Sequence, residues 1–452
     1  MAQTPADPAK KVVRVLFLAL LLDLLAFTMP LPLFPRIIED FVKQEASVTS
    51  ATPTLLSQTL HFVRAIRTYL FSFASPASTP AFPAQWDLTI LGGLLASLFS
   101  FCQFFISPFL GKLSDRFGRK PVLLASMVGN IASAALWLKA DSFGLYAMSR
   151  IIGGLSEGNV QLSIACITDV TSPATRSRSL ALVGIAFAIA FILGPSLGAH
   201  FSSRVFGRGS SIVLPTSLSS LLGVSSKVQL NSYAVPAAIT LVLLTVETLY
   251  LALCLPETRG WVKKSDEPAA PSKATASAPP SRSPPERLAR LKSLERTHFF
   301  FLFFFAGAEF TLTFATHNFF GYSNSTTGAK QALWVSAAGL AFVSATVVNS
   351  LNALASFETD PEPASSATST SASQSSVPPT HPQLEKGAAL GRFRSRGQLG
   401  RALGPLITTT LYFTVSPTCA YGACGMGMMG VAAGMGKLVR EERRKGKVEK
   451  VA

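Results

Sequence analysis

The chain carries few charged residues, and only a minority of those are acidic. Charged residues make up 14% of the 452 positions, where a soluble domain carries roughly 25%. Asp and Glu number 24 against 40 Lys and Arg, which leaves a formal charge of +16. Hydrophobic residues account for 48%, and the mean hydropathy is +0.38. This composition argues against a soluble globular domain and indicates apolar segments that lie in a bilayer.

Motifs for catalysis and for cofactor binding are missing from the sequence as well. The five cysteines lie mostly within apolar runs and form no C-x-x-C pair, so packed side chains are expected rather than metal ligands or disulfides. There is no G-x-x-x-x-G-K-[ST] loop for ATP, no triad spacing and no cofactor loop. We therefore predict neither an enzyme nor a bound cofactor or metal. The excess basic residues sit in loops beside apolar runs, which favours cytoplasmic loops over a nucleic-acid-binding face.

A short basic turn, residues 111–121, organises the chain. It lies between two apolar runs, Leu88–Leu110 and Val122–Leu138, each long enough to cross a bilayer as a helix. The turn is therefore expected to be a hairpin at the membrane surface, and its basic residues place it in the cytoplasm. Its two glycines let the helix ends approach closely, and Asp115 is the only acid among the cations.

The pattern of this turn, G-x-L-S-D-R-F-G-R-K-P, resembles the signature loop between helices 2 and 3 of the major facilitator superfamily. Arg150–Gly154 is similar to the helix-4 motif of that family. The helix-5 motif of its proton-driven antiporters, where a proline after a glycine kinks the helix, is matched by Gly184, Gly194, Pro195 and Gly198. Similarity to the tetracycline-transporter-like branch of eukaryotes is found in Leu22–Thr28, Arg150–Ala199 and Ala306–Leu312.

The resemblance implies an all-α polytopic membrane protein with the major facilitator fold, built from a six-helix N-terminal half and a shortened, about four-helix C-terminal half. The expected segments are a cytoplasmic N-terminus (1–11), an N-terminal bundle (12–259) with a long external loop (36–87), a disordered cytoplasmic linker (260–296), a C-terminal bundle (297–439) with a disordered insert (358–390), and a basic cytoplasmic tail (440–452). Apolar residues at helical spacing over 54–73 favour a surface-lying helix in the external loop. Residues 285–296 form either a short amphipathic helix or part of a solvated linker.

The second half is two spans shorter than the family requires. The chain passes from Tyr322 directly to Gln331, where the family has helices 8 and 9. The run 331–357 resembles helix 10, and Gly397–Pro405 resembles the start of helix 11. We infer that helices 8 and 9 are absent, through exon skipping or a gene-model error, which preserves the downstream topology but opens one wall of the cavity. Asn324 begins a glycosylation sequon on the expected external side.

Charged residues inside the expected helices are the candidates for transport and proton coupling. Asp23 lies within helix 1, where a charge is costly, so a functional role or a buried partner is expected. Arg150 of helix 4 is its expected partner, and the resemblance gives Arg150 a role in proton coupling; a purely structural ion pair is the alternative. Glu157 lies beyond reach of i, i+4 pairing with Arg150 and is expected to line the cavity. Glu309 of helix 7 is the candidate in the second half.

Uncharged polar residues and one histidine complete the predicted cavity. Gln103, Asn159 and Gln161 are expected either to line it or to form hydrogen bonds between helices. His317, near the external end of helix 7, is expected either to accept a proton or to lie at the membrane interface.

The basic turn is predicted to act as a gate. Its gating residues are Gly111, Asp115, Arg116, Gly118 and Arg119. In the family, the acid that matches Asp115 interacts with the positive N-terminus of helix 11 and holds the outward-facing state together. Here that N-terminus is expected near Leu399–Gly404, a segment that the shortened chain retains.

We therefore predict a multi-pass integral membrane protein of the plasma or an organelle membrane, with both termini in the cytoplasm. It is expected to move a small organic solute, drug-like or anionic, by alternating access in exchange for protons. Two alternatives stay open: a nutrient symporter or uniporter, and a transport-dead protein that acts as a membrane partner. Its expected partners are the lipid bilayer, the solute and protons, without nucleic acid, and it is expected to be a monomer. The sequence does not specify the substrate.

Overall fold

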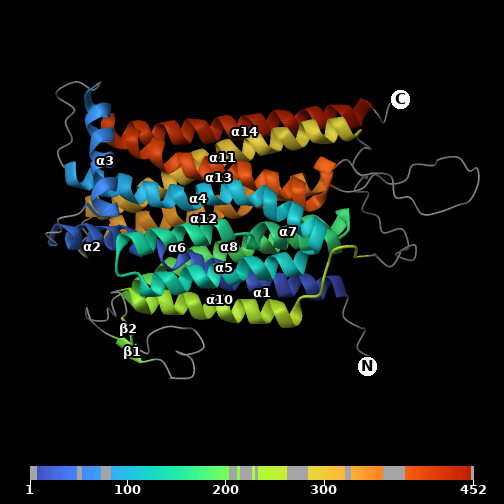
Figure 1. Cartoon of the computed structure of the whole chain (residues 1–452). Helices are drawn as coiled ribbons and strands as arrows, with labels where there is room; N and C mark the ends of the chain where they lie inside the picture. Colours follow the sequence, from blue (N-terminus) through green and yellow to red (C-terminus); the bar gives the residue numbers. More distant parts are fainter. Residues whose placement is uncertain are drawn as a thin grey trace, which may run out of the picture.

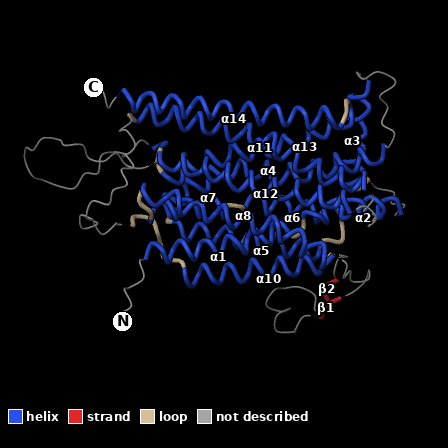
Figure 2. The backbone as a smooth tube through the Cα atoms, turned by 180° about the vertical axis from the view of Figure 1, so that it is seen from behind, coloured by secondary structure: helices blue, strands red, loops and turns tan. Residues whose placement is uncertain are grey.

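The computed structural model describes residues 8–47, 53–72, 83–202, 211–213, 227–229, 233–261, 283–320, 327–359 and 382–448. These residues form a bundle of long helices that run side by side, with a small hairpin beside one end (Figures 1 and 2). α1 (Pro8–Thr28) begins and α14 (Pro417–Val448) ends at the same end of the bundle, which we call the termini end (Figure 1). The opposite end carries α3 (Leu55–Ser72) and is called the α3 end.

The first half contributes six helical segments to the described bundle. After α1 these are α4 (Pro83–Phe117), α5 (Arg119–Lys139), the broken pair α6 (Phe143–Ser156) and α7 (Asn159–Val170), α8 (Pro173–Ser202) and α10 (Ala234–Cys254). Helices satisfy their backbone groups internally, which lipid requires. By length and apolar composition alone, four of the described helices can cross a membrane: α4, α5, α8 and α10.

The second half adds α11 (Pro284–Phe320), α12 (Thr327–Phe357), α13 (Lys386–Thr414) and α14 to the bundle. The two halves meet along two seams, where α4 packs against α13 and α8 packs against α12. Glycines allow close approach in the first seam. A Cβ on Gly111 would collide with the backbone of Gly387, and one on Gly391 would collide with the Ser107 carbonyl. The backbones of α4 and α13 are therefore in direct contact.

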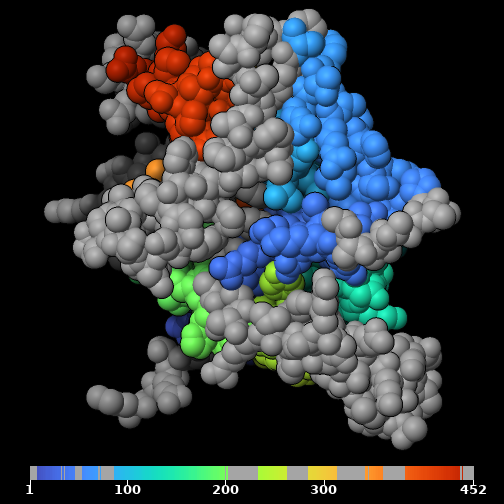
Figure 3. All heavy atoms as spheres, turned by 90° about the vertical axis from the view of Figure 1, so that its left-hand side faces the viewer, coloured from blue at the N-terminus to red at the C-terminus, as the bar shows by residue number. Residues whose placement is uncertain are grey.

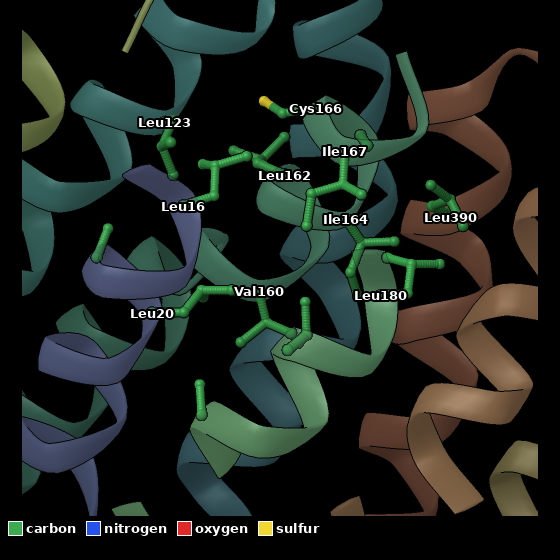
Figure 4. Packing of buried hydrophobic residues seen from close by; sticks show 14 of the residues in the cluster. Leu16, Leu20, Leu123, Val160, Leu162, Ile164, Cys166, Ile167, Leu180 and Leu390 are labelled. Carbon is green, nitrogen blue, oxygen red and sulfur yellow. The ribbon is translucent and has the colours of Figure 1, made fainter. Parts of the chain in front are cut away.

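The largest group of buried apolar side chains also joins the two halves. Figure 4 shows Leu16 and Leu20 of α1 close to Leu123 of α5 and Val160 of α7, and Leu390 of α13 belongs to the same cluster. In a bilayer such packing acts through van der Waals contact, because lipid tails are as apolar as leucine. The first half and α13 thus share one core.

The glycines of the helix-5 motif pack α8 against α1. A Cβ on Gly194 would collide with the side chain of Thr28, and one on Gly198 with the carbonyl of Met29. The Thr28 hydroxyl donates a hydrogen bond to the Ala190 carbonyl at 2.9 Å. Pro195 lies within α8, and Gly184 is buried in the same helix. These residues hold the end of α1 against α8.

Short elements cover the α3 end of the bundle. The 3-10 helix η1 (Leu31–Leu33) and α2 (Phe34–Ser47) follow α1, and Figure 3 looks onto α2 and α3 in blue. α3 occupies the predicted surface helix, and Arg67 within it pairs with Asp87 of α4 at 2.7 Å. β1 (Ser211–Val213) and β2 (Lys227–Gln229) form an antiparallel ladder between α8 and α10.

Helices extend into several segments outside the predicted bundles, and residues 285–296, for which a helix was one of two predictions, are helical. Residues 284–296 of the linker continue into α11, residues 440–448 of the tail continue α14, and the insert 358–390 ends in η3 (Pro382–Leu384) and the start of α13. The external loop 36–87 likewise contains most of α2, all of α3 and the first residues of α4.

Tertiary contacts explain the ordered part of the linker. Arg290 Nε lies 2.9 Å from Glu358 Oε1, and the Arg287 guanidinium donates to the Glu358 carbonyl. A charged segment that would be solvated alone thus gains partners at the end of α12. Residues 1–7, 262–282 and 360–381 and the sequon at Asn324 lie outside the described residues.

Candidate functional site

The predicted gate joins the two halves at the termini end. Asp115, in the last turn of α4, accepts hydrogen bonds from the backbone N–H groups of Gly387 at 2.9 Å and Ala388 at 2.7 Å. These N–H groups have no partner within α13, and the helix dipole favours a negative charge beside them. The expected location near Leu399–Gly404 was wrong, because the basic stretch before it is helical and α13 begins at Lys386.

Arg119 extends the gate into a network of charges. Its guanidinium lies 2.7 Å from the Asp115 carboxylate and 2.9 Å from that of Asp169 on α7. Lys386 of α13 reaches the second oxygen of Asp169 at 3.2 Å. Arg116, by contrast, is exposed and stacks on the neighbouring Phe117 ring. Of the two predicted gating arginines, Arg119 is therefore the one that connects the helices.

The turn between α4 and α5 depends on Gly118 and on a carboxylate from α10. Gly118 has φ 106°, in the region that favours glycine. Glu257, which follows α10, accepts hydrogen bonds from the backbone N–H groups of Arg119 at 2.8 Å and Lys120 at 3.1 Å, and so caps α5. Burial raises the pKa of Glu257, but backbone donors that include Arg259 outweigh this, and the net pKa is below its ordinary value.

A second polar group lies inside the first half. Asn159 donates a hydrogen bond to Asp23 at 2.8 Å, and the Ser126 hydroxyl donates to Asn159 at 3.3 Å. Asn130 donates to Glu157 at 3.1 Å. The break between α6 and α7 falls at Glu157, so Glu157 and Asn159, which would point to opposite sides of a continuous helix, both contact α5, and Asn159 also contacts α1.

The expected ion pair between Asp23 and Arg150 was wrong. Asp23 has Asn159 as its hydrogen-bond partner, whereas the Arg150 guanidinium carbon lies 4.3 Å from the centre of the Phe99 ring. The buried Nε of Arg150 has no hydrogen-bond partner among the described residues. Asn159 is shorter than arginine and reaches Asp23 from the first residue of α7, whereas Arg150 faces Phe99 of α4.

Two arginines and two phenylalanines form a column between the halves, which we call the Arg–Phe column (Arg150, Phe99, Phe27, Arg401). Phe99 and Phe27 have ring centres 6.0 Å apart, and Arg401 of α13 lies 5.8 Å from the Phe27 ring. Arg401 also lies 3.4 Å from Glu309 of α11. Both arginines and Phe27 are partly exposed. Guanidinium groups bind carboxylates through paired hydrogen bonds and stack on rings, so this arrangement suits an aromatic acid.

Polar side chains connect α13 with α4 near the same level. Arg394 is partly exposed and interacts electrostatically with Glu157, Asp23 and Arg401. With its amide oriented to satisfy both polar atoms, Gln398 donates to Gln103 at 2.9 Å and accepts from Arg394 at 3.0 Å. Gln103 therefore contacts the second half directly.

Of the two roles expected for Gln161, cavity lining or a hydrogen bond between helices, it has the second. It donates a hydrogen bond to the Ser107 carbonyl of α4 at 3.0 Å and so joins α7 to α4. His317 lies in α11, but its side chain is outside the described residues. In the described part of the chain no group of His, Cys, Asp or Glu residues is placed to hold a metal ion.

Among the residues of this site that sequence reasoning missed, three lie on α13: Arg394, Gln398 and Arg401. Their spacing of four and then three residues is typical of one helix face, which is the signal that could have identified them. It was overlooked because the expected helix began only at Gly397, which left Arg394 outside it. Glu309, Glu157, Asp23 and the gate residues were all predicted as candidates from their positions in the sequence.

Known proteins resemble this chain over most of its length. The Major Facilitator Superfamily profile matches residues 16–355. Major facilitator superfamily domain-containing protein 10 of Mus musculus is 31% identical over 455 aligned residues, which cover 92% of this chain and 90% of that protein. The class B tetracycline resistance protein of Escherichia coli is 31% identical over 123 residues, which cover 27% of this chain and 31% of that protein. The crystal structure of the human organic anion transporter MFSD10 (TETRAN) aligns with a TM-score of 0.64 and 26% identity, over 94% of this chain and 99% of that one.

Proposed function

Because this chain belongs to the Major Facilitator Superfamily, a family of integral membrane transporters, we propose that it is a proton-coupled secondary transporter of organic anions. Alternating access between the two halves is the proposed mechanism. Two of its relatives support the substrate class and the coupling. One is described as an organic anion transporter, and the tetracycline resistance proteins suggest a drug-type antiporter.

The observation that carries the substrate class is the Arg–Phe column. Its two guanidinium groups come from different halves, Arg150 from α6 and Arg401 from α13, with the rings of Phe27 and Phe99 between them. An aromatic carboxylate can pair with Arg401, stack on the rings and neutralise a cation that would otherwise be costly inside a membrane. Because the two arginines belong to different halves, the bound anion would also bring the halves together.

The gate determines from which side of the membrane the substrate can enter the Arg–Phe column. The network of Asp115, Arg119 and Asp169 closes the termini end, which we place in the cytoplasm. Separation of α4 from α13 at this network would open the site toward that side. Asp23, Glu157 and Glu309 are the proposed proton-coupling carboxylates, and Arg150 and Arg394 are the charges that respond to them. No nucleic acid is required, and the proposed unit is a monomer.

Uptake into proteoliposomes tests the proposal, with radiolabelled 4-aminohippurate as an aromatic carboxylate probe. Arg401→Ala removes one charge-assisted contact of about 1.5–3 kcal/mol, so it should raise the half-saturation concentration about 10- to 150-fold. Arg401→Lys keeps the charge but loses the planar stack, and should lie between wild type and Arg401→Ala. Arg178→Ala, at an exposed arginine of α8, is the matched control.

Each outcome separates the candidate functions. Equal transport by Arg401→Ala and Arg178→Ala would refute the binding role of the column. Failure of the wild-type protein to move any organic anion would favour the transport-dead membrane partner. If the anion moves in the same direction as the protons, the protein is a symporter; if it moves in the opposite direction, it is an antiporter. Uptake that does not respond to the proton gradient would identify a uniporter.

A further inference from the structure

α10 carries one carboxylate on an otherwise nearly apolar buried face. Six of its seven described buried residues, all except Pro236, recur every three or four positions, which places them on one stripe: Ala234, Ala237, Thr240, Leu244, Glu247 and Leu251. The Thr240 hydroxyl donates to the Ala26 carbonyl at 3.4 Å, so the stripe faces α1. Glu247 lies two turns further along this face and is 1% exposed.

The Glu247 carboxyl lacks the partners that a buried charge needs. Its Oε2 is buried without a hydrogen-bond partner among the described residues. Its charged neighbours are both acids, Asp23 of α1 and Glu157 at the α6–α7 break. An isolated carboxylate is strongly disfavoured in an apolar interior, and two neighbouring carboxylates oppose its ionisation further. Glu247 therefore needs a bound proton in this arrangement.

The two neighbouring carboxylates are held differently from Glu247. Asn159 and Asn130 donate hydrogen bonds to Asp23 and Glu157 respectively. Arg394 of the second half interacts electrostatically with both of these acids. The group thus has two carboxylates with amide donors and a nearby cation, and one carboxyl that has neither.

We propose that Glu247 is a proton-binding site of the transporter, in which Asp23, Glu157 and Glu247 share protons and Arg394 of the opposite half sets how many they hold. This inference rests on the proposed transport function and adds a residue to it. Its ligand is the proton, taken from water on the open side as an O–H bond forms on the Glu247 carboxylate, and returned to water on the other side.

Arg394 couples this site to the movement of the halves. While Arg394 lies beside Asp23 and Glu157, those two carboxylates can remain ionised and the proton is held at Glu247. Withdrawal of α13 removes that cation, so the three acids would then bind a further proton to avoid mutual repulsion. Proton uptake is thereby linked to the α4–α13 seam.

Infrared spectroscopy tests the site without reference to transport. The full chain in lipid bilayers should show the C=O stretching band of a protonated carboxyl group at neutral pH, and Glu247→Gln should lose it. Glu39→Gln, at an accessible glutamate of α2 that pairs with Lys43, is the matched control and should retain the band. Asp23→Asn provides a second variant. Because it removes a neighbouring negative charge, Glu247 should ionise more readily, and as the pH is raised the band should disappear at a lower pH than in wild type. A band that is unchanged in both Glu247→Gln and Asp23→Asn would overturn the proposal.

Transport then tests the coupling. Proteoliposomes with wild-type protein or Glu39→Gln should accumulate 4-aminohippurate when a proton gradient is imposed, whereas Glu247→Gln should lose the accumulation that the gradient drives. Gradient-driven accumulation equal to wild type in Glu247→Gln would also overturn the inference. If the infrared band depends on Glu247 but no protein transports the probe, the proton site stands and the proposed substrate class fails.

Discussion

Removal of the negative charge from Asp115 should open the termini end of the protein. In the structure this carboxylate accepts hydrogen bonds from Gly387 and Ala388 and an ion pair from Arg119. Asn at position 115 keeps one carbonyl oxygen, loses the charge and cannot satisfy both N–H donors as well. A hydrogen bond to a charged group contributes about 1.5–3 kcal/mol and a neutral one about 0.5–1.5 kcal/mol. The two backbone contacts should together lose about 2–3 kcal/mol on this scale.

That loss acts on the equilibrium between the closed and the open termini end. Since 1.36 kcal/mol is a factor of ten, 2–3 kcal/mol corresponds to about a 30- to 150-fold shift toward the open form. Ser107 reports this opening, because it is 1% exposed and its carbonyl lies against Gly391 of α13. In a variant without native cysteines, Ser107→Cys should react with a membrane-impermeant maleimide much faster when Asp115→Asn is also present.

A variant of the same loop provides the control. Arg116→Gln removes an exposed charge that contacts Phe117 rather than α13, so it should leave the labelling rate unchanged. Equal labelling in Asp115→Asn and wild type would show that the cap on α13 does not hold the seam closed. Faster labelling in Arg116→Gln as well would indicate a general charge effect of the loop instead.

Two further predictions concern stability. Glu257→Gln should lower the melting temperature at neutral pH, because the pKa of the Glu257 carboxyl is lower in the folded protein than in the unfolded chain. The ionised carboxylate therefore stabilises the fold above the unfolded pKa of about 4.3, and this stabilisation is lost as the pH falls through the folded pKa. The difference from wild type should therefore vanish in acid, and a constant difference would contradict the capping role. Gly198→Val should lower the melting temperature through overpacking of about 1–3 kcal/mol against Met29. Gly436→Ala, which meets open space, should not, and equal effects of the two would refute the close contact of α1 and α8.

The fold could be predicted well from the sequence because a bilayer restricts the solutions. Long apolar runs must become helices, so the run Val122–Leu138 was found as α5 within three residues at each end, whereas α4 extends five residues before and seven residues beyond the predicted run Leu88–Leu110. The gate was also predictable, since the loop motif specifies both the acid and its helix-terminus partner. The residue at which the partner helix α13 begins was not predictable, because the helicity of residues 386–398 depends on contacts with α4 that a basic, glycine-containing sequence does not reveal.

The interior of the site was harder to predict for a related reason. Opposite charges in neighbouring helices suggest an ion pair, yet Asp23 binds Asn159 and Arg150 stacks on Phe99. The deciding factor is the break between α6 and α7 at Glu157, which changes the direction of every side chain after it. Sequence periodicity assumes a continuous helix, so it cannot predict the new direction of the side chains after the break. Arg394 was missed because its helix was not expected to extend so far.

α11 has a mechanical consequence beyond its role as a span. Its 37 residues form one continuous helix, about 55 Å long at 1.5 Å per residue. One end is attached to the tip of α12 through Arg290 and Glu358, and further along Glu309 meets α13. Between them, Gly400 and Gly404 let α13 pack directly against the α11 backbone, and Gly307 extends this close contact to Thr408. Because this contact continues over several turns, α11 and α13 should move together as one unit when the halves separate.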